Sequence, residues 1–171
     1  TMKRPEENEY APYYDRYISL VPEKDIMAAY EKHGEIVAQA FVEAGVKKGE
    51  TFAYAVGKWS IREMLGHLID AERVFGFRAY TFSRFDPNPL PSFEENDYIR
   101  HSPYAKTPLA ELSAEFLLLH SANKMLYARM GEVEWSAIGT ASNNKVSVRA
   151  LAYMTVGHAR HHLSVLHERY R

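Results

Sequence analysis

"SIREMLGHLIDAERVFGFRAYTFS", residues 60–83, contains the clearest helix signal in this chain of 171 residues. Ser60 and Glu63 have the spacing of a capping box, in which each side chain accepts a hydrogen bond from the other residue's backbone N–H. Trp59, directly before them, suits the outer position of a hydrophobic staple. We therefore predict a helix from Ser60 to about residue 84. Its apolar face recurs at the helical period and consists of Ile61, Met64, Leu65, Leu68, Ala71, Phe75 and Phe82.

Three other segments have the same helical period. One spans residues 24–44, and Gly45 is the expected stop. A second begins at Thr107 and Pro108, which suit the N-cap and the first helical position, and runs to about Met130. The last spans residues 148–168, after Ser147 as its N-cap.

The connections between the predicted helices contain no alternating strand pattern. Residues 84–108 are rich in proline, which excludes a long helix there, and residues 135–144 read as a second loop. Helices of this length with two long connections predict an all-α fold, a four-helix bundle with long crossover loops. We expect one domain over residues 1–171.

The composition excludes several classes of function. Hydrophobic residues make up 46% of the chain, and the net charge of −1 argues against nucleic acid as the main partner. There is no cysteine, so a metal site would have to use His, Asp or Glu. No apolar run approaches the roughly 18 residues of a membrane span, and the first residues lack the apolar core of a secretory signal. We expect a cytoplasmic protein with no membrane partner.

"VGHARHHLSVLHERY", residues 156–170, places histidines where the last helix should be apolar. Residues i and i+4 share a helix face, so His158 and His162 lie within the apolar stripe. His161 falls at the margin of that stripe and His167 points away. Two imidazoles at this spacing can hold one metal ion. We therefore predict His158 and His162 as ligands, and prefer His162 to His161.

A third ligand must come from another helix. His67 is the best candidate, because it follows Glu63 by one turn and lies beside the core stripe. His33 and His120 are expected to be surface or seam residues without a ligand-type partner. His101, in the proline-rich loop, approaches the site or stays in water. Asp70 and Glu72 are expected to be solvated.

Two short motifs together resemble a known family. "KWSIREMLGHLIDAERVF" and "VGHARHHLSVL" are similar to the DinB-like (damage-inducible) family of four-helix bundles, which includes the YfiT-like metal-dependent hydrolases. The resemblance extends from about residue 20 to about residue 167. It implies that His67, His158 and His162 bind a divalent metal. It also implies a choice of reactions, because family members include thiol transferases that use low-molecular-weight thiols and a thiol-dependent isomerase.

Three neutral imidazoles leave open coordination positions, which is typical of a catalytic metal site, and they suit zinc or nickel. We expect a metal-dependent enzyme, first a low-molecular-weight-thiol transferase acting on a small molecule. The alternatives are a metal-dependent hydrolase and a non-catalytic metal- or ligand-binding bundle of a stress response. In the proline-rich loop Glu94, Glu95 and Asp97 are expected to reach the bundle mouth, and the predicted substrate contacts are Asp97, Tyr98 and Arg100. The expected assembly is a homodimer.

Overall fold

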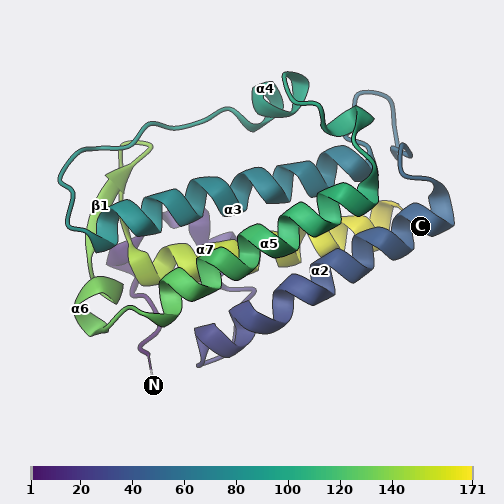
Figure 1. Ribbon diagram of the computed structural model, residues 1–171. Coiled ribbons are helices and arrows are strands. Elements are labelled where there is room, and N and C mark those ends of the chain that lie inside the picture. Colours follow the sequence, from purple (N-terminus) through teal and green to yellow (C-terminus); the bar gives the residue numbers. More distant parts are fainter. Residues whose placement is uncertain (1, 171) are drawn as a thin grey trace.

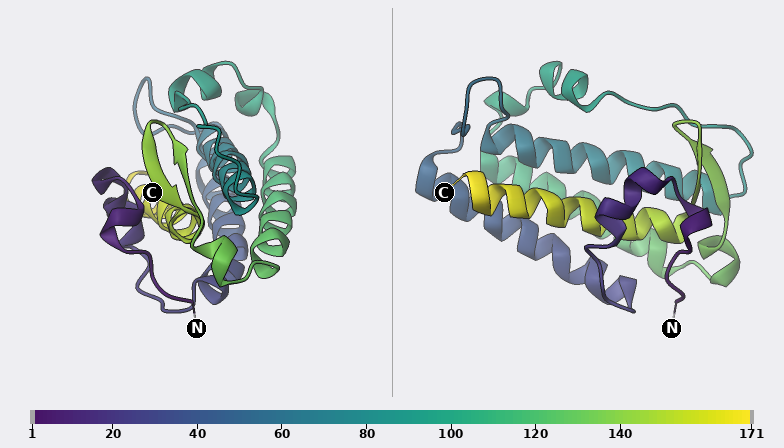
Figure 2. Two further views of the ribbon diagram at one scale, coloured as in Figure 1. Left: turned by 90° about the vertical axis from the view of Figure 1, so that its left-hand side faces the viewer. Right: turned by 180° about the vertical axis from the view of Figure 1, so that it is seen from behind.

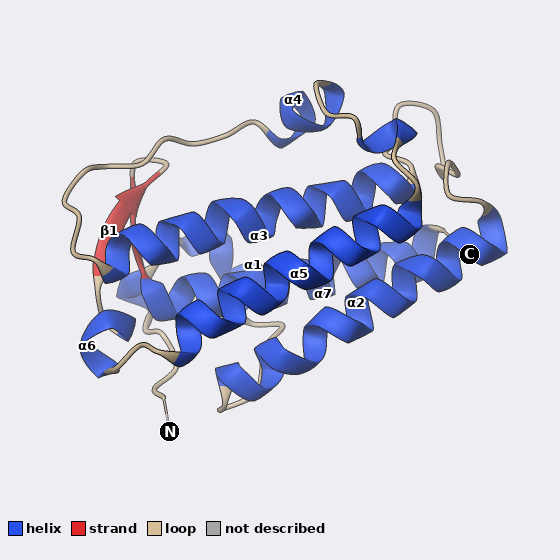
Figure 3. Ribbon diagram, viewed as in Figure 1, coloured by secondary structure: helices blue, strands red, loops and turns tan. Residues whose placement is uncertain are grey.

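A computed structural model describes residues 2–170, and four long helices form its core (Figure 1). The predicted all-α four-helix bundle is confirmed, and helices dominate the fold (Figure 3). Within residues 2–170 no helix combines the length and the apolar character needed to cross a membrane. The bundle helices are α2 (Ile26–Lys48), α3 (Ile61–Ser83), α5 (Leu109–Ala128) and α7 (Val148–Arg169). The short helices are α1 (Asp15–Ile18), α4 (Glu95–Arg100) and α6 (Glu132–Trp135), with single 3₁₀ turns at Glu7–Glu9, Pro12–Tyr14 and Tyr104–Lys106.

The ends of α2 and α3 show which local signals hold. The predicted capping box is formed at α3, where Glu63 accepts from the Ser60 N–H at 2.8 Å. Gly45, the predicted stop of α2, lies instead inside the helix. A side chain at this position would meet Leu109 Cδ2 at 2.5 Å, which explains why the residue is glycine. The helix ends at Gly49, whose φ of +90° favours glycine. Gly45 is therefore a packing residue.

Helix α5 begins one residue later than predicted. Pro108 is its N-cap and Leu109 its first residue. The Leu109 N–H donates at 3.0 Å to the carboxylate of Glu50, which comes from the connection between α2 and α3. A free N–H at the first turn is thus satisfied from another part of the chain, which a local pattern does not reveal.

The segment predicted as a loop over residues 135–144 contains a β-hairpin. Strand β1 (Ile138–Ala141) pairs antiparallel with β2 (Asn144–Ser147). The turn residues Ser142 and Asn143 both have positive φ, 51° and 61°, as the two-residue hairpin turn requires. The loop prediction was wrong because two strands of four residues are too short to show alternation. The hairpin packs over the end of α3.

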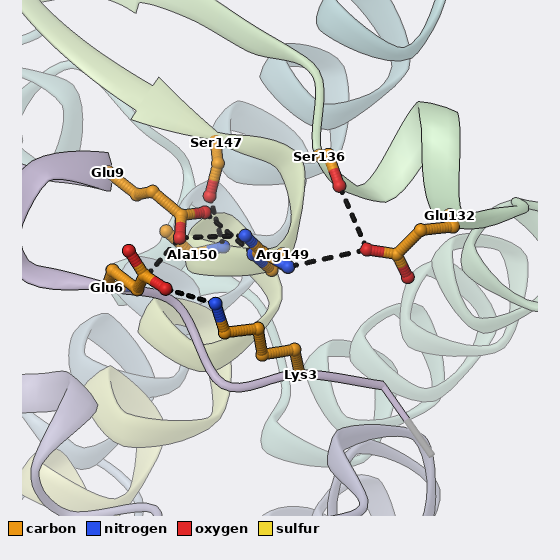
Figure 4. A network of polar contacts seen from close by, with 8 residues as sticks. All are labelled: Lys3, Glu6, Glu9, Glu132, Ser136, Ser147, Arg149 and Ala150. Atoms are coloured by element: carbon orange, nitrogen blue, oxygen red, sulfur yellow. Dashed lines mark hydrogen bonds and ion pairs between the residues drawn. The ribbon is translucent and has the colours of Figure 1, made fainter.

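The N-terminal segment lies across α7 on the back of the bundle (Figure 2, right). Its anchor is a buried ion pair, in which Arg149 donates to Glu9 through two hydrogen bonds of 2.7 and 2.8 Å. Figure 4 shows Arg149 between Glu9 and Glu132, which lies 3.6 Å away. Further along, the Tyr17 carbonyl occupies the space where a Gly157 side chain would be. This approach places Tyr17 beside His158.

The close approach at Gly157 gives a test of the fold. Gly157→Ala is expected to lower the melting temperature by about 3 to 10 °C, because relieving a backbone clash costs roughly 1–3 kcal/mol. A glycine-to-alanine change inside a helix normally stabilises by about 0.5–1 kcal/mol, so the sign is diagnostic. Thermal unfolding followed by circular dichroism measures it. Gly131→Ala is the control, since its new methyl group would meet only the flexible Glu134 carboxylate, at 3.2 Å. A more stable Gly157→Ala protein would contradict this packing.

Candidate metal centre

Three histidines from two neighbouring helices converge inside the bundle. His67 comes from α3, and His158 and His162 come from α7. His158 Nε2 lies 3.0 Å from His67 Nε2 and 3.2 Å from His162 Nε2. His161 is exposed, with its ring 5.7 Å from that of Tyr17. The structure thus brings together the three histidines selected from the sequence, and it places His162 rather than His161 in the group.

The two short contacts of His158 Nε2 cannot both be good hydrogen bonds. An imidazole nitrogen has one in-plane direction, which carries either a proton or a lone pair. A second nitrogen at 3.2 Å is therefore left without a partner in that direction. A cation held by metal–nitrogen bonds of about 2.0–2.1 Å instead separates neighbouring ligand nitrogens by roughly 3.0–3.4 Å. The three Nε2 atoms fit a shared divalent ion better than they fit one another.

The protonation states favour the same arrangement. Burial lowers the pKa of His67 to about 4. Burial also lowers the pKa of His162 and His158, and the neighbouring imidazoles lower both further. All three rings are therefore neutral at pH 7, the form that ligates a metal. The Nδ1 atoms of His67 and His162 are buried and have no hydrogen-bond partner within residues 2–170.

Aromatic rings enclose the three histidines. Trp59 lies against His67, with ring centroids 4.7 Å apart, and Tyr17 meets the edge of His158 at 5.2 Å. Phe75 approaches His158 at 6.0 Å. These contacts restrict the orientation of the imidazoles and lower the local dielectric constant, which strengthens any electrostatic interaction at their Nε2 atoms.

Two cavities reach the histidines, and each contains a residue of α4. One, of about 230 Å³, is lined by His67, His158 and Glu95 together with N-terminal tyrosines and the hairpin turn. The other, of about 220 Å³, is lined by His162 and Asn96 with Trp59 and Tyr170. Figure 1 shows α4 lying over α3, so this short helix covers the site.

Glu95 is the acidic residue that the structure brings to the histidines. Its Oε2 atom lies 3.6 Å from His67 Nε2, and about half of its side chain is exposed. Burial of the other half raises the pKa of Glu95, and the negative charge of Glu94 adds to this. The segment after α4 is fixed by Tyr104, which donates to Asp70 at 2.7 Å and packs its ring against Gly66.

The predicted substrate contacts Asp97, Tyr98 and Arg100 line neither of these cavities. Asp97 and Arg100 form an exposed ion pair of 2.5 Å, and Tyr98 packs against Phe93. The reason is the helical period of α4: Ile99 is buried, and Glu95, four residues before it, shares its face. His101 is exposed and lies with its Nδ1 2.8 Å from the Asp97 carbonyl. A proline-rich segment predicted as a loop has no helix face from which this separation could be expected.

A second polar cluster corrects three expectations. His33 and His120 were expected at the surface or at a helix seam without a ligand-type partner, and Glu72 was expected to be solvated, yet their exposed fractions are only 3%, 4% and 2%. Their ligand-type atoms also lie within 4.8 Å of one another. The Glu72 carboxylate, however, already has donors: Tyr30 at 2.6 Å, Asn123 at 2.8 Å and His120 Nδ1, which lies 2.9 Å away. Neither cavity described above reaches it. We interpret it as a network that joins α2, α3 and α5.

Two glycines could have indicated this buried network from the sequence. A side chain at Gly34 would meet the ring of His120 at 2.5 Å, and one at Gly76 would meet Asn123 at 2.5 Å. Each glycine therefore leaves space for a polar side chain of the facing helix α5, and that side chain reaches Glu72. Glycines inside strong helical patterns, at the level of polar residues on other helices, are a recognisable mark of such a buried network.

Comparisons with known proteins agree with this architecture. Residues 29–166 match the DinB superfamily. YfiT from Bacillus subtilis, described as "a probable metal-dependent hydrolase with an unusual four-helix bundle topology", superposes with a TM-score of 0.72. The superposition covers 96% of this chain and 89% of that chain at 16% sequence identity, so the likeness to YfiT is one of fold. No curated protein sequence matches the chain.

Proposed function

This chain belongs to the DinB superfamily, and we propose that it is a metal-dependent hydrolase of small molecules. His67, His158 and His162 would hold the divalent ion, and zinc and nickel both suit imidazole ligands. The observation that carries the proposal is the position of His158 Nε2, within 3.2 Å of both other Nε2 atoms. The description of YfiT as a probable metal-dependent hydrolase supports the same reaction class.

When bound, the cation supplies Lewis-acid chemistry, which polarises a carbonyl group and lowers the pKa of a water molecule. Glu95 is placed to act as the general base, because its carboxylate lies 3.6 Å from His67 Nε2 at the wall of the cavity. It would take a proton at Oε2 and return it to the leaving group.

Glu95→Gln is expected to lower the hydrolysis rate roughly 100-fold or more without removing metal, because positioned proton transfer contributes about that much. The wild-type rate should rise with pH as Glu95 ionises. The glutamine variant should lack this limb of the profile. The measurement is initial rates on small chromogenic esters and amides between pH 4.5 and 8.

Glu94→Gln is the matched control, since Glu94 lines the same cavity but makes no contact with His67. Its glutamine oxygen can still accept from the Asn96 N–H and keep the cap of α4. A Glu95→Gln protein as active as Glu94→Gln would show that Glu95 is not the base.

A low-molecular-weight-thiol transferase is the second candidate. Two cavities meet the histidines, one at His67 and His158 and one at His162, an arrangement that suits two substrates. The chain has no cysteine, so the thiol would have to be a cosubstrate. Zinc-loaded and nickel-loaded protein should be given an electrophile with and without a small thiol. Turnover that requires the thiol would favour the transferase, and ester cleavage without thiol would favour the hydrolase.

Three further expectations are part of the proposal. We propose that residues 1–171 act as one domain, that the protein works in the cytoplasm, and that it forms a homodimer. Sedimentation velocity at several protein concentrations tests the assembly. The bundle and its three histidines are formed by one chain, so the proposed metal site does not require the dimer.

A further inference from the structure

Arg78 lines the same cavity as the histidines, but further along α3. His67, Ala71, Phe75 and Arg78 all border this cavity, at the spacing of one helix face. At a rise of 1.5 Å per residue, the Cα atoms of His67 and Arg78 are about 16 Å apart along the helix. Helical side chains lean toward the helix N-terminus, which for Arg78 is the direction of His67. The cavity therefore runs from the imidazoles of His67 and His158 to a guanidinium group.

The charge of Arg78 has no carboxylate partner within residues 2–170. The side chain is only 4% exposed, yet it forms none of the ion pairs found for other arginines of the chain. Its two hydrogen bonds both come from Nη2, to the Pro91 carbonyl at 3.1 Å and to Ser142 Oγ at 3.2 Å. The Tyr14 side chain also interacts with it.

A buried, unpaired charge is costly, so this arrangement calls for an anion. A guanidinium group has five N–H donors, and the two hydrogen bonds above use only Nη2. The remaining donors can bind an anionic group through two parallel hydrogen bonds. Burial lowers the pKa of Arg78, in keeping with an environment that does not compensate its charge.

We propose that Arg78, together with Tyr14 and Ser142, forms an anion subsite that binds a carboxylate or phosphate group of the substrate. The substrate is then a small, elongated anion with its reactive bond at the histidine end of the cavity. Ala71 and Phe75 line the space between and suit an apolar middle, and the ring of Phe93 lies 6.0 Å from the guanidinium group at the Arg78 end. The assignment of the reactive end rests on the proposed function, whereas anion binding at Arg78 can be tested without it.

The competing explanation is that Arg78 only fastens the proline-rich segment to the hairpin turn, through Pro91 and Ser142. A fastening role predicts that substitutions lower the melting temperature and leave anion affinity unchanged in the folded protein. An anion subsite predicts a specific loss of affinity. Isothermal titration calorimetry with hexanoate, hexyl phosphate and hexylamine separates the two explanations, with circular dichroism of every variant as the check on folding.

The expected result is that the wild-type chain binds hexanoate or hexyl phosphate but not hexylamine, and the tighter anion identifies the preferred group. Arg78→Gln should weaken anion binding roughly 10- to 100-fold, the range for loss of a charged hydrogen bond. Arg78→Lys should weaken it less, since the charge remains but the fork is lost. Arg73→Gln is the matched control, because Arg73 lies on the same helix, exposed and paired with Glu115.

His162→Ala separates this proposal from the proposed function. It should lose metal and keep hexanoate binding, because His162 does not line this cavity. An affinity for hexanoate that is the same in Arg78→Gln as in the wild type would overturn the subsite. Loss of hexanoate binding in His162→Ala would also overturn it. No anion binding by the wild-type chain would also overturn it, whatever the hydrolysis assays show.

A direct measurement covers the case in which Arg78→Gln does not fold. The Nε–H resonance of Arg78 in the wild-type chain, identified by its absence in Arg78→Lys, should shift when hexanoate is added. A resonance left unchanged by saturating hexanoate and by saturating hexyl phosphate would overturn the proposal.

Discussion

His162→Ala is expected to reduce bound metal from about one ion per chain to almost none. Removing one of three imidazole ligands should weaken binding more than roughly 100-fold, since loss of even an outer-shell partner costs 10- to 100-fold. His161→Ala, its neighbour on α7, is expected to keep the ion, because His161 is exposed and stands outside the converging group. Elemental analysis after dialysis against zinc or nickel measures both variants.

A third variant locates the ion if these expectations fail. His33 belongs to the buried cluster with Glu72 and His120, which is also rich in ligand-type atoms. His33→Asn should leave metal content unchanged. Metal lost from His33→Asn and retained by His162→Ala would place the ion in the buried cluster, and metal lost from His161→Ala alone would reverse the choice of ligand.

The histidine pair could be predicted from the sequence because its geometry is local. Spacing of four residues places His158 and His162 on one helix face wherever that helix packs. His67 was harder, since its approach depends on how α3 lies against α7, but a polar residue beside the core stripe marked it. The capping box at Ser60 is equally local, and the structure contains it.

Glu95 was expected only as one of three acidic residues, with Glu94 and Asp97, that reach the bundle mouth, and the sequence could not single it out. Its position depends on α4, a helix of six residues, and on the anchoring of the following segment by Tyr104 against Gly66 and Asp70. These contacts join residues more than 30 positions apart, so no local period reveals them. Of the predicted contacts, Asp97 and Arg100 form an exposed ion pair, and Tyr98 lines a different cavity together with Phe93 and Arg78.

The expectation that Glu72 is solvated was wrong for a related reason. Periodicity assigns a charged residue to solvent, but burial is decided by partners that three other residues bring to it: Tyr30 from α2, and His120 and Asn123 from α5. The cost of burying its charge is offset only when all these donors are present. Its exposure therefore depends on the packed bundle, and it is the residue whose loss should matter most for stability.

Glu72→Ala is expected to lower the free energy of unfolding by about 3–5 kcal/mol, the usual cost of breaking a buried charged network. The change leaves the hydroxyl of Tyr30 without its acceptor in the core, and the amide of Asn123 keeps only the backbone carbonyl of residue 72. Glu72→Gln should cost less, because its oxygen can still accept. Glu35→Ala is the control: Glu35 is an exposed glutamate of α2, and the expected change is within about 0.5 kcal/mol.

The free energy of unfolding that is lost in Glu72→Gln should also depend on pH. Burial alone would raise the pKa of Glu72, but the hydrogen bond with His120 and the imidazole of His33, 3.5 Å away, lower it below its ordinary value of 4.5. The unfolded chain therefore takes up the proton first, and the stability due to this carboxylate is complete well above pH 4.5 and declines as the pH falls below it. The difference between the wild type and Glu72→Gln should shrink by about 1 kcal/mol between pH 4.5 and 3.5.

Burial lowers the pKa of His33 below its ordinary value of 6.5. The unfolded chain again binds the extra proton, so acid also weakens this part of the network, beginning below pH 6.5. The wild type and Glu72→Gln share this contribution to the extent that the glutamine still faces His33. The difference in unfolding free energy between the two proteins therefore reports on the Glu72 carboxylate. Urea unfolding of both proteins at pH 7.5, 5.5, 4.5 and 3.5 gives that difference. A constant difference across this range would mean that the pKa of Glu72 is the same in the folded and unfolded chain, and a difference that grows as the pH falls from 7.5 to 4.5 would mean that Glu72 is protonated in the folded bundle.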